Sequence, residues 1–188
     1  MSTNAAPTPS RSRTRRNATD TYLTVTLGTE YFALPILRVR EIIGITEITP
    51  VPRMPAHVRG VLNLRGKVIP VIDLRRRLGF ESVPDHKRTC IVIVQAGSGA
   101  DLIQVGAVVD RVSEVRDIPP SAIEPPPRMG KAIDLACITG VGKFGRQVVM
   151  LLDVDRVAGR EEIAAAVATP AGSAPANASS APVPVRKD

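Results

Sequence analysis

The chain has 188 residues, of which 44% are hydrophobic, so it can bury the core of one ordinary domain or of two small units that share a core. Its formal net charge of +7 suggests nucleic-acid binding, but residues 1–19 carry four arginines and no acid, whereas residues 20–159 carry only +3. Aromatic residues make up 3% of the sequence and tryptophan is absent, which leaves few side chains for base stacking. We therefore expect no specific nucleic-acid partner.

Composition divides the chain into a body and two tails. Residues 1–19 are rich in Ser, Thr, Pro, Ala and Arg, which predicts a disordered basic arm. Residues 160–188 predict the end of a short helix and then a disordered tail rich in Ala and Pro. The sequence has no apolar run of the length that a signal peptide or a membrane span needs. We therefore expect residues 20–159 to form the folded domain, in the cytoplasm.

The first part of the body predicts a hairpin followed by an ambiguous segment. Residues 22–27 alternate with period two, Gly28 begins a turn, and residues 31–34 predict the second strand. Residues 36–42 fit either a strand or a short helix, and Pro35 favours a helical first turn.

The centre of the body predicts strand, turn, strand and helix in close succession. Two apolar runs, 61–64 and 68–72, flank Gly66. Because glycine accepts the positive φ that a tight hairpin turn needs, we expect the two runs to be paired strands. Asp73 is expected to cap a short helix that Gly79 closes. We expect the three arginines of this helix, residues 75–77, to form a solvated face; contact with an acidic partner is the alternative.

The second half predicts further short strands. Residues 89–94 and 102–109 flank a glycine-rich turn, and residues 111–116 follow as another strand. The proline-rich stretch 119–128 predicts a linker that donates few hydrogen bonds, because proline lacks a backbone N–H. After it come two apolar strands and a terminal helix that starts near Asp153.

About ten short strands and only two or three short helices predict an all-β sandwich or a pair of barrels. With about 140 residues in the body, the strand count favours two five-stranded barrels.

Four sequence blocks resemble one known family. They are GVLNLRGKVIPVIDLRRRLG in the centre of the chain and the segments 36–42, 105–112 and 149–154. In this order and at these spacings they resemble the CheW family of bacterial chemotaxis coupling proteins, over about residues 21–159. The two tails lie outside the resemblance.

The resemblance implies a fold of two five-stranded SH3-like β-barrels around a common hydrophobic core. It also implies a non-enzymatic adaptor without a cofactor. Such an adaptor joins the cytoplasmic tip of methyl-accepting chemotaxis proteins to the histidine kinase CheA, whose regulatory domain is itself CheW-like. The protein would then lie at receptor arrays and associate with the membrane only through the receptors.

The resemblance also implies site residues. Positions associated with receptor contact are Ile36, Val39, Val105, Gly106 and Val112. Positions associated with kinase coupling are Glu41, Gly60, Asn63, Arg65 and Gly66. Within the second set, Glu41 and Arg65 match an acid and a base of the family that are expected to form a partly buried pair.

Other interpretations of these residues remain open at this point. Ile36 and Val39 are three apart and would share a helix face, which is more often core than interface. Cys90 and Cys137 lie in apolar runs and are typical of buried small hydrophobes, although an enzyme that uses one of them is an alternative. Two further alternatives are a small barrel that binds nucleic acid and a CheW-like adaptor of a chemosensory pathway for pili, gliding or gene regulation.

Overall fold

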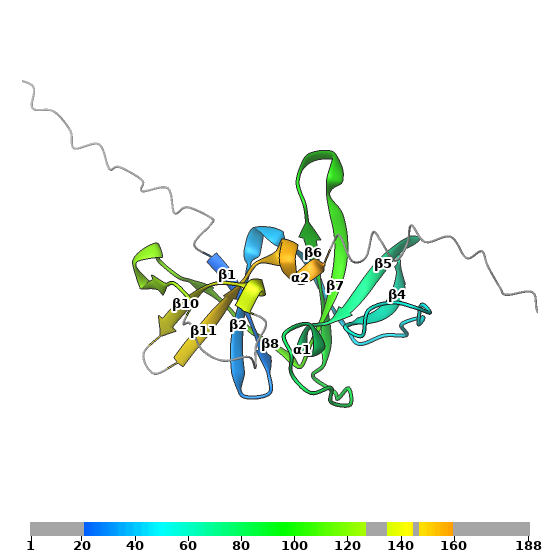
Figure 1. The fold of residues 1–188 in the computed structure, drawn as a ribbon, viewed down its shortest axis with the longest axis horizontal. Coiled ribbons are helices and arrows are strands. Elements are labelled where there is room, and N and C mark those ends of the chain that lie inside the picture. Colours follow the sequence, from blue (N-terminus) through cyan, green and yellow to red (C-terminus); the bar gives the residue numbers. More distant parts are fainter. Residues whose placement is uncertain (1–20, 127–134, 145–146, 160–188) are drawn as a thin grey trace, which may run out of the picture.

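The computed structural model describes residues 21–126, 135–144 and 147–159; the basic arm and the Ala/Pro-rich tail lie outside the described residues. The described chain is built mainly of short strands, with a few helical turns of three to five residues (Figure 1). This confirms the expected all-β class. In these ranges no helix has the length and apolar character needed to cross a membrane.

The strands form two sheets. One sheet has the strand order β8-β1-β2-β11-β10-β9, and the other has the order β3-β6-β7-β5-β4. The strands of the first sheet are β1 (Thr21–Leu27), β2 (Glu30–Pro35), β8 (Arg111–Asp117), β9 (Ile123–Glu124), β10 (Ile138–Phe144) and β11 (Gln147–Leu152). Those of the second are β3 (Val39–Gly44), β4 (Val58–Leu64), β5 (Lys67–Asp73), β6 (Cys90–Ala96) and β7 (Ile103–Val109).

Helical turns connect the strands. They are η2 (Ile36–Arg38), α1 (Leu74–Arg77), η3 (Gly99–Asp101), η4 (Pro120–Ala122), η5 (Leu135–Cys137) and α2 (Val154–Ala158). Asp73 caps α1 as expected, since its Oδ1 accepts a hydrogen bond from the backbone N–H of Arg76 at 3.2 Å. Asp153 caps α2 in the same way, which confirms the helix expected there.

The first sheet has six strands where the sequence predicted five. The additional strand is β9, which lies inside the proline-rich stretch that we expected to remain unpaired. Ile123 and Glu124 keep their backbone N–H groups, and they pair antiparallel with Gly142 and Val141 of β10. A two-residue strand is too short for any periodic signal in the sequence.

Three groups of buried apolar side chains make up the core. The largest includes Leu23 and Leu34 from the first sheet together with Val94 and Val105 from the second. Each sheet also has a smaller cluster of its own. The two sheets are therefore joined through one shared core, in agreement with the expectation from the family resemblance.

A buried ion pair lies at one of the two places where the described chain passes from one sheet to the other. Asp110 separates β7 from β8, and its carboxylate accepts hydrogen bonds from Arg75 of α1 at 2.8 Å (Nε) and 2.6 Å (Nη2). The same carboxylate accepts a bond from the N–H of Gly28, in the β1–β2 turn, at 2.6 Å. The two side chains are only 14% and 16% exposed. Asp110 thus links elements of both sheets.

The expectation of a solvated arginine face on α1 holds for Arg76, which is exposed, and is wrong for Arg75 and Arg77, which are half-buried. Arg75 is largely buried against Asp110, as just described. Arg76 donates to the carbonyl oxygen of Ala56 at 3.1 Å, and Arg77 donates to that of Arg156 at 2.7 Å. All three side chains therefore fasten α1 to distant segments, which a run of like charges in the sequence does not reveal.

Removal of the Asp110 charge should cost stability in a pH-dependent way. The Arg75 guanidinium, more than the Gly28 N–H, lowers the pKa of the Asp110 carboxyl, against the opposing effect of burial. A lowered folded-state pKa gives stability that is present above the unfolded pKa, about 3.9, and is lost as pH falls through the folded value. We expect Asp110→Asn to lower the free energy of unfolding by about 2–3 kcal/mol at pH 7, and this difference from wild type to shrink below about pH 4.

Urea unfolding of both proteins over a pH series measures this difference. Glu124→Gln is the matched control, because the Glu124–Lys143 pair is more than half exposed and should contribute under about 1 kcal/mol. A deficit for Asp110→Asn that is the same at pH 7 and pH 3 would contradict the assignment.

Candidate partner-binding surfaces

The β4–β5 turn consists of Arg65 and Gly66, which both have positive φ, 51° and 84°. Two such residues in succession match the right-handed twist of a two-residue hairpin. The side chain of Asn63 stabilises the turn, since its Oδ1 accepts a hydrogen bond from the N–H of Gly66 at 2.9 Å. The structure thus confirms the expected strand, turn and strand, and it places Asn63, Arg65 and Gly66 together.

The Arg65 side chain reaches across to Glu41 of β3. Its Nη2 lies 2.8 Å from Glu41 Oε2, and its Nη1 lies 3.3 Å from Oε1. The pair expected from the family resemblance is therefore present. It is not buried on both sides, because the Arg65 side chain is 78% exposed and only that of Glu41, at 28%, is largely covered. Since β3 and β4 are opposite edges of the five-stranded sheet, the pair connects these two edges.

Gly60 lies on β4, where the segment that contains Thr49 packs against this strand. Thr49 exchanges two backbone hydrogen bonds with Val61, of 2.8 and 2.9 Å. Gly60 is buried with φ +142°, and a Cβ atom built on it would lie 2.1 Å from the carbonyl oxygen of Thr49. Only glycine fits this position. Gly60 therefore holds the base of the hairpin that presents Arg65.

The residues matched to receptor contact divide into two groups. Ile36, Val39 and Val112 are half-buried and pack against the shared core. Ile36 starts η2, whereas Val39 starts β3, so the two do not share a helix face as the three-residue spacing suggested. Their exposed parts are available to a partner, although each also contributes to the core.

The remaining two, Val105 and Gly106, lie inside the five-stranded sheet. Val105 is 0% exposed and belongs to the shared core. A Cβ atom on Gly106 would lie 2.8 Å from the Cγ2 atom of Ile91. Val105 therefore exposes no side chain and Gly106 has none, and both residues lie within the sheet, two strands away from Val39.

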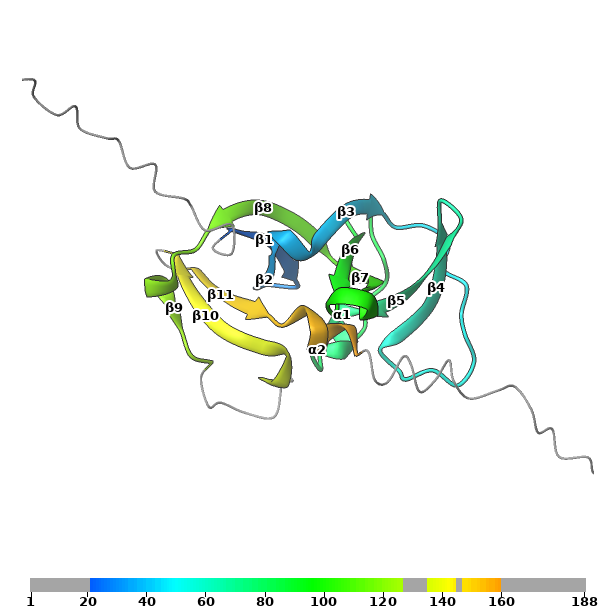
Figure 2. The same ribbon diagram turned by 90° about the horizontal axis from the view of Figure 1, so that it is seen from above.

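Two features near these residues were missed by sequence reasoning. Leu37 is 60% exposed, Ile42 is 45% exposed and Val115 is 54% exposed. They lie on η2 and on the edge strands β3 and β8, which run along the same side of the molecule in Figure 2. The β3 sequence VREIIG does not alternate apolar and polar residues, so periodicity gave no signal of this apolar strip.

The second missed feature is Arg38, which fixes η2 in place. Its Nη2 lies 2.7 Å from Asp155 of α2, and its Nη1 donates to the carbonyl oxygens of Gly97, at 2.8 Å, and Gln95, at 3.2 Å. The η2 turn is thereby tied to α2 and to the end of β6. Because these segments are far apart in sequence, no local pattern predicts the contact.

The cysteines have the environment of packing residues. Cys137 is buried and Cys90 is half-buried. Burial raises the pKa of the Cys90 thiol, with partial compensation by a backbone hydrogen bond at Val112. A raised pKa reduces the thiolate fraction that a nucleophile needs. Among the residues that the structure describes, no group of three or more His, Cys, Asp or Glu side chains is placed to hold a metal ion.

A family model for the CheW-like domain matches residues 21–162, which include both sheets. The chain belongs to the CheW-like domain family. Chemotaxis protein CheW of Klebsiella aerogenes is 33% identical over 143 residues, which are 76% of this chain and 84% of the relative. The CheW protein of Rhizobium meliloti is 35% identical over 140 residues, or 74% of this chain and 88% of the relative.

A solved structure agrees with the sequence relatives of this CheW-like chain. The crystal structure of scaffolding protein TtCheW from Thermoanaerobacter tengcongensis has a TM-score of 0.67 and 33% sequence identity. The match covers 73% of this chain and 91% of TtCheW. The two-sheet architecture described above is therefore that of a known CheW scaffold.

The two glycines of the β4–β5 hairpin should respond differently to alanine. Gly60→Ala introduces a clash of 2.1 Å with backbone, so we expect it to destabilise the fold by more than about 3 kcal/mol. Gly66→Ala meets open space and is strained only by its positive φ, so about 1–2 kcal/mol is expected. Chemical denaturation of the two variants measures this order, and equal losses would contradict the close approach of Thr49 to Gly60.

Proposed function

We propose that the protein is a non-enzymatic scaffold that couples the cytoplasmic tips of methyl-accepting chemotaxis proteins to the histidine kinase CheA. The observation that carries this proposal is the CheW-like family match across residues 21–162, which takes in every described strand. A scaffold of this kind needs no chemistry of its own. It alters kinase output when it binds one signalling arrangement of its partners better than another.

The kinase-coupling surface is the β4–β5 turn with Glu41, and the buried Gly60 supports it from the base of the hairpin. A non-glycine residue with positive φ costs about 1–2 kcal/mol, and Arg65 carries this strain at an exposed hairpin tip. Strain held at an exposed position supports a role for the side chain itself, since glycine or asparagine would occupy the turn with less strain. The Asn63 and Glu41 contacts hold the Arg65 backbone and side chain in one geometry, ready to bind.

The receptor surface is the strip formed by η2, β3 and β8. Ile36, Val39 and Val112 contribute its half-buried parts, and the exposed apolar side chains Leu37 and Ile42 enlarge it. Apolar side chains on a groove or strip are typical of surfaces that bind an amphipathic helix. Val105 and Gly106 contribute indirectly, because they lie inside the sheet and support the strands on which the strip lies.

The finer architecture is also part of the proposal. We infer that each sheet is the basis of an SH3-like barrel. In the five-stranded sheet, the Thr49–Val61 bridge and the Arg65–Glu41 pair join segments at its two edges and support this inference. The scaffold would lie in the cytoplasm at receptor arrays and reach the membrane only through the receptors.

A second candidate is a CheW-like adaptor of a chemosensory pathway for pili, gliding or gene regulation. It is favoured by the similarity to Protein FrzA of Myxococcus xanthus, a relative with a different name, which is 35% identical over 106 residues. Those residues are 56% of this chain and 64% of FrzA. Both candidates share the scaffold mechanism and differ in the receptors that are bound.

Charged substitutions should separate the two surfaces. We expect Leu37→Asp to weaken receptor binding at least about tenfold and to leave CheA binding unchanged, because Leu37 is 60% exposed on η2. Arg65→Glu should weaken CheA binding and leave receptor binding unchanged, because it places an acid beside Glu41 at the turn. Titration of each variant with the CheA regulatory domain and with a receptor fragment measures both affinities.

Val83→Asp is the matched control, because Val83 is 42% exposed in the 81–88 loop, outside both surfaces. It should leave both affinities unchanged. The assignment of the surfaces is wrong if Leu37→Asp and Arg65→Glu each weaken both partners equally or neither partner.

A further inference from the structure

A groove opens where β5 and β7 separate. The two strands pair in parallel only from Val71 and Gly106 onward. Ahead of this pair, their first residues border a groove of about 810 Å³ together with the loop that carries Val51 and Met54. The groove is distinct from the receptor strip, which lies on η2, β3 and β8.

The groove lies on a face of β5 and β7 whose other end is buried in the shared core. Because side chains alternate along a strand, Val68 lies on the same face of β5 as Ile72, and Ile103 on the same face of β7 as Val105. Ile72 and Val105 belong to the shared core, which also contains Val157 of α2. Helix α2 therefore belongs to the core in which one end of this face is buried, and it packs against the neighbouring strand β6; the groove is the other end of the face.

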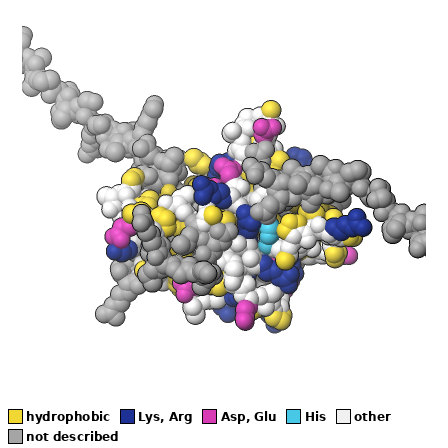
Figure 3. All heavy atoms as spheres, in the orientation of Figure 1, with side chains coloured by type: hydrophobic (Ala, Val, Ile, Leu, Met, Phe, Trp, Pro, Cys, Tyr) yellow, Lys and Arg dark blue, Asp and Glu magenta, His cyan; other side chains and the backbone are white. Residues whose placement is uncertain are grey.

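The uncovered end is strongly apolar. Val68 is 70% exposed, Leu102 is 41% exposed and Val51 is 37% exposed. Figure 3 shows hydrophobic side chains gathered over the β4–β5 end of the molecule with basic groups at their edge. A contiguous apolar surface with a polar rim is typical of a binding site rather than of free surface.

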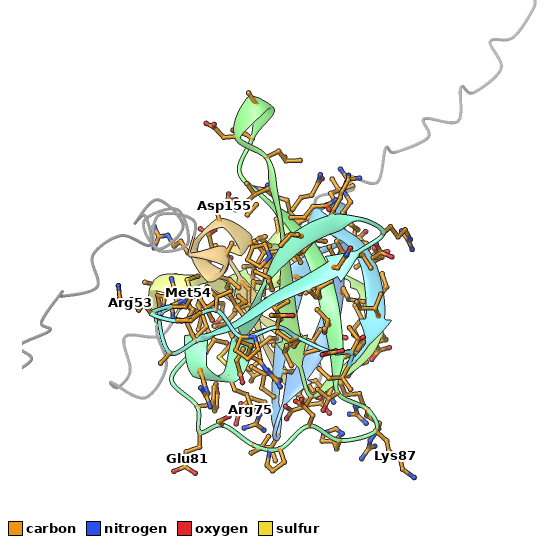
Figure 4. All side chains as sticks on the ribbon, turned by 90° about the vertical axis from the view of Figure 1, so that its right-hand side faces the viewer. Arg53, Met54, Arg75, Glu81, Lys87 and Asp155 are labelled. Atoms are coloured by element: carbon orange, nitrogen blue, oxygen red, sulfur yellow. The ribbon has the colours of Figure 1, made fainter. Side chains whose placement is uncertain are left out.

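The chain leaves α2 next to this groove. Asp155 of α2 accepts a hydrogen bond of 2.6 Å from the N–H of Gly97, two residues beyond Gln95, which lines the groove. Helix α2 ends at Gly159, whose φ of 57° turns the chain out of the helix. In Figures 1 and 2 this end of α2 lies on the side that faces β5, and Figure 4 shows Asp155 and Met54 on the same side of the molecule.

We propose that residues 160–169 bind in this groove through Ile163 and Val167. These two apolar residues are four positions apart among alanines, a spacing that puts both on one face of a bound helix. Ile163 follows Gly159 by four residues, so it lies within about 14 Å of the end of α2, the helix that Asp155 ties to Gly97, two residues from the groove-lining Gln95.

The charges of residues 160–169 and of the groove rim also support this segment as the occupant of the groove. Residues 160–162, which precede Ile163, are Arg160, Glu161 and Glu162, so this part of the segment has a net charge of −1. Lys67 lines the groove and Arg53 lies next to Met54, and neither forms an ion pair with an acid of the described chain. The segment thus offers acids where the groove rim offers bases. This inference uses only the groove and the segment, and it does not depend on the proposed function.

Disulfide trapping in the full-length protein tests the proposal. In a Cys90→Ala/Cys137→Ala background, Val68→Cys is combined with Ile163→Cys in one variant and with Val167→Cys in another, and Val68→Cys with Ala165→Cys is the control. The three partners have tethers of similar length, so binding through one helix face should make the intramolecular disulfide of residue 163 or 167 form about tenfold faster than that of 165. Equal rates for all three would overturn the proposal, and so would a disulfide that forms only between two chains, which would assign the groove to a second copy.

Hydrogen exchange provides a second readout that needs no disulfide geometry. In full-length Ile163→Asp/Val167→Asp, amides of residues 67–71 and 102–105 should exchange about tenfold faster than in wild type, because the apolar cover is lost. The matched variant Val183→Asp/Val185→Asp should behave as wild type. Unchanged exchange in the first variant would overturn the proposal.

Discussion

The orientation of the two sheets depends on the ion pair between Asp110 and Arg75. Asp110 stands at one of the two points where the described chain crosses between the sheets, where β7 passes into β8, and its carboxylate also holds the β1–β2 turn through Gly28. Because the pair is largely removed from water, loss of either partner leaves an uncompensated charge, which makes this junction costly to distort. The strip on η2, β3 and β8 draws its strands from both sheets, so the surface proposed for the receptor exists only while this junction keeps its geometry.

Local chemistry in the sequence predicted much of the fold. The β4–β5 hairpin, the Asp73 cap and the helix after Asp153 each follow from residues within a few positions of one another, and glycine or a short carboxylate side chain decides the backbone conformation at each. The Arg65–Glu41 contact was expected from the family resemblance rather than from any pattern in the chain. The structure adds that this pair spans the opposite edges of a sheet.

What the sequence could not predict depends on contacts between distant segments. The arginines of α1 look like an exposed charged face until the fold brings Asp110, Ala56 and Arg156 against them. Val105 matches a family position associated with receptor contact, yet its strand has neighbours on both sides and its side chain is buried in the core that the two sheets share. Strand β9 is a further example, because two residues between prolines carry no periodicity and pair only because β10 lies beside them.

The central claim is that one chain bridges two partners by means of separate surfaces. The most direct measurement is co-sedimentation of CheA with membranes that contain a methyl-accepting receptor, as the concentration of the full-length protein is raised. The account predicts that CheA sediments with the receptor membranes in proportion to bound protein and stays in the supernatant without it. If the protein sediments with the receptors and leaves CheA behind, or if CheA sediments equally well without the protein, the bridging account is contradicted.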